Sequence, residues 1–188
     1  MLRHSGDMTA HLKPLQRASA IAIALATLGL APHSLGPALV SDSQAAEPVI
    51  AISFISPHAP RVLADEQAAL AADANAERVR RGLHALVRDE ALDRFAYAKG
   101  LEMASRAYFG HTNPEGVTFA DRLRAFHWPT PYAAENIAFD RDEPHAHAAF
   151  MNSPPHARNL LDPRERRFGV AVVTVQTNET FYVQDFSE

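Results

Sequence analysis

Apolar residues recur at steps of three and four positions in two long segments of the chain. The first segment spans residues 63–81 and is followed by Gly82, a residue type that commonly ends helices. The second spans residues 90–109, between Asp89, whose carboxylate suits an N-cap, and Gly110. Both patterns predict amphipathic helices that turn one side toward a core.

Turn and cap signals follow the second helical segment. Residues 113–116 read Asn-Pro-Glu-Gly, which suits a type I turn with Pro in the second position and Gly in the fourth. Thr118 and Asp121 have the spacing of a capping box, which predicts a short helix that ends near Phe126. We therefore expect His111 to be held by ordered structure.

The C-terminal part of the chain predicts further helices and strands. Residues 134–139 have an extended pattern, and residues 144–152 and 154–161 are predicted as two helices. Two β-branched runs, at residues 168–175 and 180–186, predict a hairpin. Helices come early and strands late, without a βαβ rhythm, so the predicted fold class is α+β, with helices layered on an antiparallel sheet.

The N-terminal segment has a different composition. Basic residues precede an uncharged apolar run at residues 18–31, and small residues follow at residues 43–46. This is the organisation of an export signal, removed after Ala45 or Ala46. The run is shorter than the ~20 residues that span a bilayer comfortably, so an uncleaved anchor is the less favoured alternative.

These boundaries predict three parts: a signal peptide at residues 1–45, an extension at residues 46–65 and one domain at residues 66–188. Within the extension, residues 47–57 fit either an edge strand or an extended surface tail. The mature protein is expected to be secreted or periplasmic, without a stable membrane span after cleavage.

The composition narrows the classes of function. A formal net charge of −4 and a pI near 6.2 offer no basic face for phosphates, so no nucleic-acid partner is expected. The absence of cysteine excludes disulfides, thiolate metal sites and cysteine nucleophiles. The standard signatures of serine nucleophiles, metalloproteases and nucleotide-binding loops do not occur. The arginine clusters at residues 78–81 and 164–167 are interpreted as solvated faces.

The candidate chemistry centres on His111, Glu135 and His156. Two neutral imidazoles and a carboxylate are the ligand types of an open zinc site. Glu135 could coordinate the metal, or could accept a hydrogen bond from a ligating imidazole and fix its tautomer. His156 falls in the first turn of a helix opened by Ser153 and Pro154, where the positive helix end favours a neutral ring. The alternative is that each side chain only satisfies its own loop or helix.

Several short motifs also occur in a characteristic order. They are Asn75-x-x-Arg78-x-x-x-Gly82-Leu83, Gly110-His111-Thr112, Glu135-Asn136-Ile137-Ala138, Asn152-Ser153-Pro154-Pro155-His156 with Asn159-Leu160-Leu161, and a closing Gly169-Val170. Over roughly residues 70–186 the chain resembles the CAP superfamily of cysteine-rich secretory, antigen 5 and pathogenesis-related 1 proteins, in a bacterial, cysteine-free form. The resemblance implies a three-layer α-β-α sandwich with a central antiparallel sheet.

The resemblance also implies a site. His111 and His156 match the two histidines of the family's central cavity, where they would hold a divalent metal such as zinc, and Glu135 matches the cavity glutamate. Ser153 falls near the fourth cavity position, where many members have a second acid. The chain departs from the usual residues at Ala134, Phe150, Pro155 and Arg158.

Two classes of function follow from the resemblance. The first is a binding or interaction module for a small hydrophobic ligand, such as a lipid or sterol, or for a cell-surface partner. The alternative is a metal-dependent hydrolase that uses a metal-activated water with Glu135 as general base. The missing second acid and the absence of an evident nucleophile favour the binding module.

Overall fold

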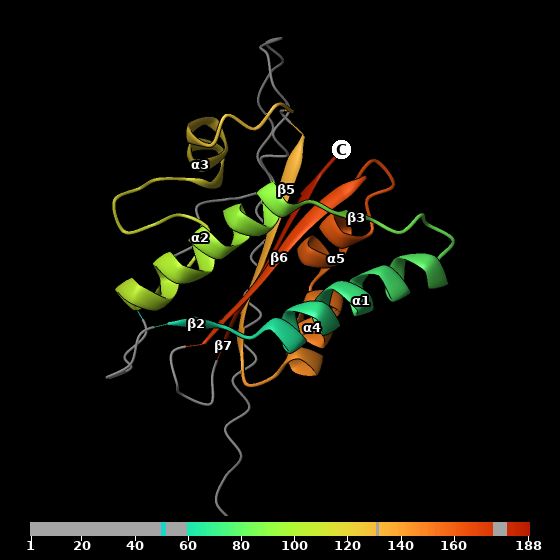
Figure 1. Cartoon of the computed structure of the whole chain (residues 1–188), viewed down its shortest axis with the longest axis horizontal. Coiled ribbons are helices and arrows are strands. Elements are labelled where there is room, and N and C mark those ends of the chain that lie inside the picture. The colour runs from blue at the N-terminus through green and yellow to red at the C-terminus, as the bar shows by residue number, and fades with distance from the viewer. Residues whose placement is uncertain (1–49, 52–59, 131, 175–179) are drawn as a thin grey trace, which may run out of the picture. The chain divides into compact units, whose positions relative to one another are not determined.

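The computed structural model describes residues 50–51, 60–130, 132–174 and 180–188, and the chain is discussed over these ranges (Figure 1). The helices are α1 (Ala64–Arg80), α2 (Glu90–Arg106), α3 (Phe119–Ala125), α4 (Glu143–Asn152) and α5 (Pro154–Leu160). The strands are β1 (Ile50–Ala51), β2 (Arg61–Val62), β3 (Val87–Arg88), β4 (Tyr108–Phe109), β5 (Ala133–Asp140), β6 (Arg167–Thr174) and β7 (Thr180–Ser187).

The main sheet has the strand order β2-β6-β7-β5, and all neighbours in this order pair antiparallel. β3 joins the same sheet by pairing with β6 in parallel, which is the one departure from the predicted antiparallel arrangement among the described strands. β6 and β7 form the predicted hairpin, with Phe168 opposite Phe186. β5 lies at the end of the strand order, next to β7.

Helices cover both faces of this sheet, which makes the predicted three-layer α-β-α sandwich (Figure 1). α2 packs on one face, and α1, α4 and α5 pack on the other. The side chains of β6 alternate accordingly. Val170 and Val172 pack in the cluster that includes Phe150 of α4, whereas Ala171 and Val173 pack with Met103 of α2. Residues at both odd and even positions of β6 are buried, because helices cover both faces of the sheet and neither face meets water.

α2 lies unusually close to β6 at one point. Gly169 has no side chain, and a Cβ atom built on it would lie 2.1 Å from the backbone carbon of Leu92 and 2.4 Å from the backbone nitrogen of Asp93. Nearby, the Asp93 carboxylate accepts a hydrogen bond from the backbone N–H of Val170 (2.9 Å). The helix backbone therefore rests directly on the strand backbone at this glycine.

Local capping signals start α2 and α3 where the sequence predicts. The carboxylate of Asp89 accepts hydrogen bonds from the backbone N–H groups of Ala91 and Leu92, at 2.8 Å and 3.3 Å. Thr118 and Asp121 form the predicted capping box. These helix starts depend on residues three or fewer positions apart, and for that reason they can be read from the sequence.

The predicted end of α2 is wrong by about one turn. The helix ends at Arg106 because Ala107, rather than Gly110, adopts a left-handed conformation with φ 53°. Tyr108–Phe109 then leave the helix axis and pair as β4 with Ile50–Ala51. Within the 47–57 segment, Ile50–Ala51 therefore form an edge strand, which is one of the two predicted alternatives.

The arginine cluster at residues 78–81 is not uniformly solvated, contrary to the prediction. Arg78 is fully buried, and its guanidinium donates to the backbone carbonyls of His84 (2.9 Å), Leu160 (2.7 Å) and Asp162 (3.0 Å). These hydrogen bonds offset the cost of desolvating the charge and tie α1 to the end of α5. In the second cluster, Glu165 is buried as well.

No helix among the residues that the structure describes is both long enough and apolar enough to cross a bilayer. The predicted signal peptide at residues 1–45 lies outside the described residues, as do residues 46–49 and 52–59 of the predicted extension.

Candidate functional site

Glu135 of β5 is the centre of a buried polar cluster. Its Oε1 lies 2.8 Å from Nδ1 of His111, and its Oε2 lies 2.5 Å from a guanidinium nitrogen of Arg122. Both carboxylate oxygens are therefore engaged. Burial alone would raise the pKa of Glu135, but the charge of Arg122 and the hydrogen bond with His111 outweigh burial and hold this pKa well below its usual range.

Three elements place these side chains. Glu135 and Ile137 point to the same face of β5, and Ile137 packs in the cluster that contains Met103 of α2, so Glu135 faces the α2 layer. Arg122 comes from α3, which starts at the capping box. His111 comes from the segment that follows β4, two residues after that strand.

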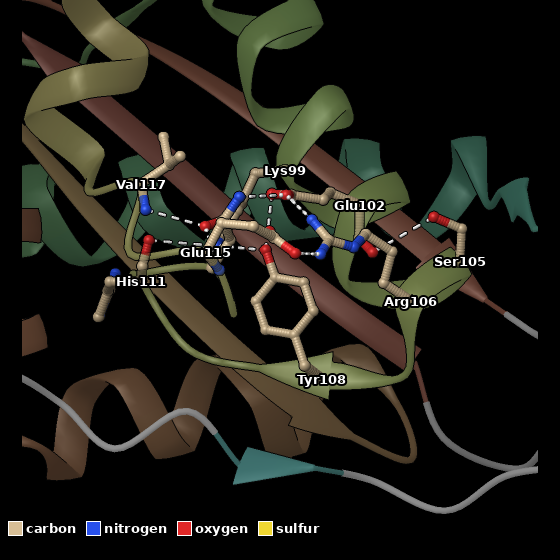
Figure 2. Close-up of polar contacts among 9 residues, drawn as sticks. Lys99, Glu102, Ser105, Arg106, Tyr108, His111, Glu115 and Val117 are labelled. Atoms are coloured by element: carbon tan, nitrogen blue, oxygen red, sulfur yellow. Dashed lines mark hydrogen bonds and ion pairs between the residues drawn. The ribbon is translucent and has the colours of Figure 1, made fainter.

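Lys99 of α2 supports the backbone beside His111. Its Nζ donates to the hydroxyl of Tyr108 (3.1 Å) and to the backbone carbonyl of His111 (3.2 Å), as Figure 2 shows. The residue is 1% exposed, and this burial lowers the pKa of Lys99 to about 8. The loop that carries His111 is thus anchored to α2 by a buried ammonium group.

Asp185 of β7 lies directly opposite Glu135 across the β5–β7 pair. Opposed residues of an antiparallel pair share a face of the sheet, so two carboxyl groups are buried side by side. Neither carboxyl oxygen of Asp185 has a hydrogen-bond partner among the described residues. Burial, and then the negative charge of Glu135, raise the pKa of Asp185 well above its ordinary value.

His156 approaches from the opposite layer, as the third residue of α5. Its ring centre lies 6.4 Å from that of His111, and the ring of Phe150 meets it edge-on with centres 5.5 Å apart. Because β5 ends the strand order, groups from the two layers can meet beyond its free edge. The pKa of His156 is lowered to about 4, mainly by burial and to a smaller extent by the charge of His111. Burial, more than the helix end, keeps this ring neutral.

The structure thus places His111, Glu135 and His156 close together, but it gives Ser153 no described contact with them. Ser153 stands at the N-cap position of α5, where its backbone carbonyl accepts from Ala157 (2.9 Å), yet its side chain makes no capping hydrogen bond. The second acid near the cluster is instead Asp185, from a strand that is distant in sequence.

Sequence reasoning missed the three charged residues around Glu135. Lys99 carried a signal, because it falls at a helical step of the apolar stripe of α2 and so belongs to the buried face. Asp185 carried a weaker one, as an acid within a strand that is otherwise apolar at alternate positions. Arg122 carried none, since an arginine on a short polar helix is ordinarily solvated.

A family model described as the cysteine-rich secretory protein family, CAP, matches residues 72–186. The chain belongs to the CAP family. This match covers the whole of the site and nearly all of the sandwich, from α1 to the last strand.

Two curated proteins of Bacillus subtilis are similar to this CAP chain. An uncharacterized protein, YkwD, is 37% identical over 100 residues, which are 53% of this chain and 39% of the relative. An uncharacterized membrane protein, YlbC, is 31% identical over 113 residues, or 60% of this chain and 31% of the relative. The chain therefore spans well under half the length of each of these relatives.

Solved structures share the fold of this CAP domain. An extracellular protein with an SCP domain from Bacillus anthracis superimposes with a TM-score of 0.58 at 29% identity, covering 65% of this chain and 40% of that one. An outer surface protein from Borrelia burgdorferi gives the same TM-score at 20% identity, over 65% of this chain and 91% of its own. The second likeness, at this low identity, concerns the fold alone.

The donor groups of the CAP site fit a metal only in part. Among the described residues, no three His, Asp or Glu side chains are grouped closely enough to hold an ion together. Glu135 has no free oxygen, since one contacts His111 and the other Arg122. The residues present can therefore offer two imidazoles, with the carboxylate orienting one of them and water filling the remaining positions.

Replacing Asp185 by asparagine is expected to stabilise the domain at pH 7 to 8. A folded-state pKa above the unfolded value means that the native state holds a proton that the unfolded chain releases. Stability therefore falls as the pH rises above the ordinary carboxyl value of 3.8 and toward the raised pKa of the folded state. The slope from one such group is at most about 1.4 kcal/mol per pH unit. An asparagine side chain keeps the shape of the neutral acid and has no proton to lose.

Urea unfolding at pH 5, 7 and 8 measures this effect. The control is Glu90→Gln, because that side chain is 95% exposed and its change is expected to shift stability by less than about 0.5 kcal/mol. A variant Asp185→Asn that loses stability with rising pH as steeply as the wild type would contradict a proton held at this position.

Proposed function

We propose that this CAP domain is an exported binding module in which His111 and His156 hold a divalent metal ion such as zinc. The observation that carries the proposal is the chain of contacts from Arg122 through Glu135 to Nδ1 of His111. A carboxylate on one ring nitrogen fixes the tautomer and leaves the other nitrogen for a metal.

The two rings are near each other but farther apart than in a formed zinc site. Zinc–nitrogen bonds of about 2.0–2.1 Å in tetrahedral geometry place the centres of two ligating imidazoles roughly 5 Å from each other. The ring centres of His111 and His156 are 6.4 Å apart, so the proposal requires the rings to approach by about 1 Å when the ion binds. The lowered pKa of His156 means that its ring does not have to lose a proton before it binds a metal at neutral pH.

Export is supported by the basic and apolar pattern of residues 1–45 and by the Bacillus anthracis protein, which is described as extracellular. We assign the domain to the outside of the cytoplasmic membrane, either secreted or periplasmic. A cell-surface partner or a small hydrophobic ligand is the proposed target. Lipid extracted from the purified protein and identified by mass spectrometry tests the lipid or sterol ligand.

We expect one zinc ion to bind each purified domain, with a lower affinity than zinc has for sites with four protein ligands. His111→Ala and His156→Ala are each expected to abolish binding in calorimetry, because neither remaining imidazole can hold the ion alone. His145→Ala is the matched control, since His145 lies exposed on α4 and its loss is expected to leave zinc binding unchanged. Zinc bound equally by the wild type and both site variants would contradict the proposal.

The hydrolase alternative has less support. A general base needs a pKa near the working pH, whereas Arg122 and His111 hold the pKa of Glu135 far below neutrality. Both of its oxygens are also occupied. Zinc-loaded protein, screened against peptide, ester and glycan substrates, tests this alternative. Turnover that disappears in a folded Glu135→Gln variant would establish it.

A further inference from the structure

A pocket of about 380 Å³ lies beside the buried cluster, between α2, α3 and the turn that precedes α3. Its lining comprises Phe95, Ala98, Lys99, Glu102, Asn113, Val117, Arg122, Ala125 and Phe126. His111 and His156 are not part of this lining. The volume falls in the range of pockets that hold small organic ligands.

The walls of the pocket are apolar and partly aromatic. Phe95 and Phe126 lie with ring centres 5.2 Å apart, and Phe126 also stacks on Trp128. Phe126 and Val117 are 38% and 37% exposed, which is high for large apolar side chains. Apolar groups that line a hollow and remain open to water favour a ligand with an apolar body, and the two rings favour an aromatic one.

The acid in the pocket lining, Glu102, and the acid paired with Arg122, Glu135, are already engaged. Glu102 accepts from the hydroxyl of Tyr108 (2.6 Å), from the side-chain amide of Asn113 (2.9 Å) and from Arg106 (2.9 Å), as Figure 2 shows in part. Glu135, behind Arg122, is engaged through both oxygens. Asp185, the other buried acid of the cluster, is not part of the lining, so the pocket itself offers a cationic ligand no free carboxylate.

The cationic groups have unused donors. The Lys99 ammonium has three N–H groups, and its described acceptors are the Tyr108 hydroxyl and the His111 carbonyl, both neutral. The Nε of Arg122 is buried and has no acceptor among the described residues. Buried donors without acceptors are costly, so the lining is best completed by a group that accepts hydrogen bonds and carries negative charge.

We propose that this pocket binds a small aromatic carboxylate, with its ring packed against Phe126 and Val117 and its carboxylate at the end of the pocket formed by Lys99 and Arg122. The site is separate from the two histidines and does not depend on a metal. It adds a ligand of defined chemistry to the proposed binding module.

Three probes that differ only in the head group test the proposal: 4-phenylbutyrate, 4-phenylbutanol and 4-phenylbutylamine. Calorimetry or NMR titration is carried out with EDTA present, so that failure of the metal proposal does not affect the result. The carboxylate is expected to bind at least ~10-fold more tightly than the alcohol, because charge-assisted hydrogen bonds are stronger than neutral ones. The amine is expected to bind most weakly.

Two variants locate the site. Val117→Gln is expected to weaken the binding of 4-phenylbutyrate about 10-fold. Val87 is an exposed apolar residue outside the lining, so Val87→Gln is expected to leave this binding unchanged. Lys99→Met is expected to remove the preference for the acid over the alcohol while the alcohol still binds. His156→Ala is expected to bind 4-phenylbutyrate as the wild type does.

Val117→Gln changes an exposed side chain, so its result remains decisive if Lys99→Met does not fold. Equal affinity for the acid and the alcohol, unchanged binding to Val117→Gln, or no binding at millimolar 4-phenylbutyrate would each overturn the proposal.

Discussion

Replacing Arg122 by alanine is expected to destabilise the folded domain by about 3–5 kcal/mol, the usual cost of removing one partner of a buried ion pair. The side chain of Glu135 is fully buried, and that of Arg122 is 14% exposed. Without the guanidinium, the carboxylate would keep the hydrogen bond with His111 but lose its nearest full charge. The carboxylate would then have to stay ionised at a higher free-energy cost, or take up a proton.

Packing adds to this loss. The guanidinium of Arg122 lies 5.1 Å from the ring centre of Phe95 and 5.5 Å from that of Phe119, within reach of cation–π attraction. Its removal would therefore leave a gap between α2 and α3 as well as an unpaired charge. The change in stability is measured by urea unfolding at pH 7.

Arg124→Ala is the matched control. Arg124 lies on the same helix with a side chain 73% exposed and pairs with Asp121 at the surface, so its loss is expected to cost no more than about 1 kcal/mol. The double variant Arg122→Met with Glu135→Gln is expected to recover part of the loss, because neither member then remains charged and buried. Equal stability of Arg122→Ala and Arg124→Ala would show that the buried pair is not an important source of stability.

Gly169→Ala is expected to cost more than about 3 kcal/mol, beyond the usual range for overpacking a core. The added Cβ would lie 2.1 Å from the carbonyl carbon and 2.3 Å from the carbonyl oxygen of Leu92. Both are backbone atoms of α2, so no side-chain rotation can relieve the contact. The helix would have to move away from the sheet and give up packing along its length.

Gly100→Ala provides the comparison within the same interface. Its added Cβ would meet a side-chain methyl of Val173 at 2.8 Å, and alanine gains about 1 kcal/mol of helix propensity over glycine. We expect this variant to lose clearly less stability than Gly169→Ala. Thermal and urea unfolding of both variants measures the difference. A Gly169→Ala protein as stable as Gly100→Ala would contradict the close approach of α2 to β6.

The helix boundaries show how far local signals reach. The starts of α2 and α3 depend on Asp89 and on the Thr118–Asp121 pair, which act within three residues. The end of α2 does not follow from such a signal. Ala107 takes a left-handed conformation that alanine alone does not favour, and the strand pairing of Tyr108–Phe109 with Ile50–Ala51 accompanies it. A contact between segments more than fifty residues apart decides this boundary.

Buried charges show the same limit. Arginine and glutamate are normally solvated, so composition and spacing predicted an exposed cluster at residues 78–81. Arg78 is buried because carbonyl groups from the His84 region and from the end of α5 meet around it. The His84 carbonyl is local to Arg78, but the Leu160 carbonyl is 82 residues away and meets the guanidinium only when α5 packs beside α1.

The order of motifs along the chain was sufficient to identify the CAP family and the α+β sandwich, and to predict that His111, Glu135 and His156 lie near one another, because caps, strand alternation and family motifs are local patterns. Packing of the layers decided the rest: that both oxygens of Glu135 are occupied, that Lys99, Arg122 and Asp185 surround it, and that a pocket opens beside them. The physical reason is that charge pairing and burial depend on distances through space, which strand register and helix packing set.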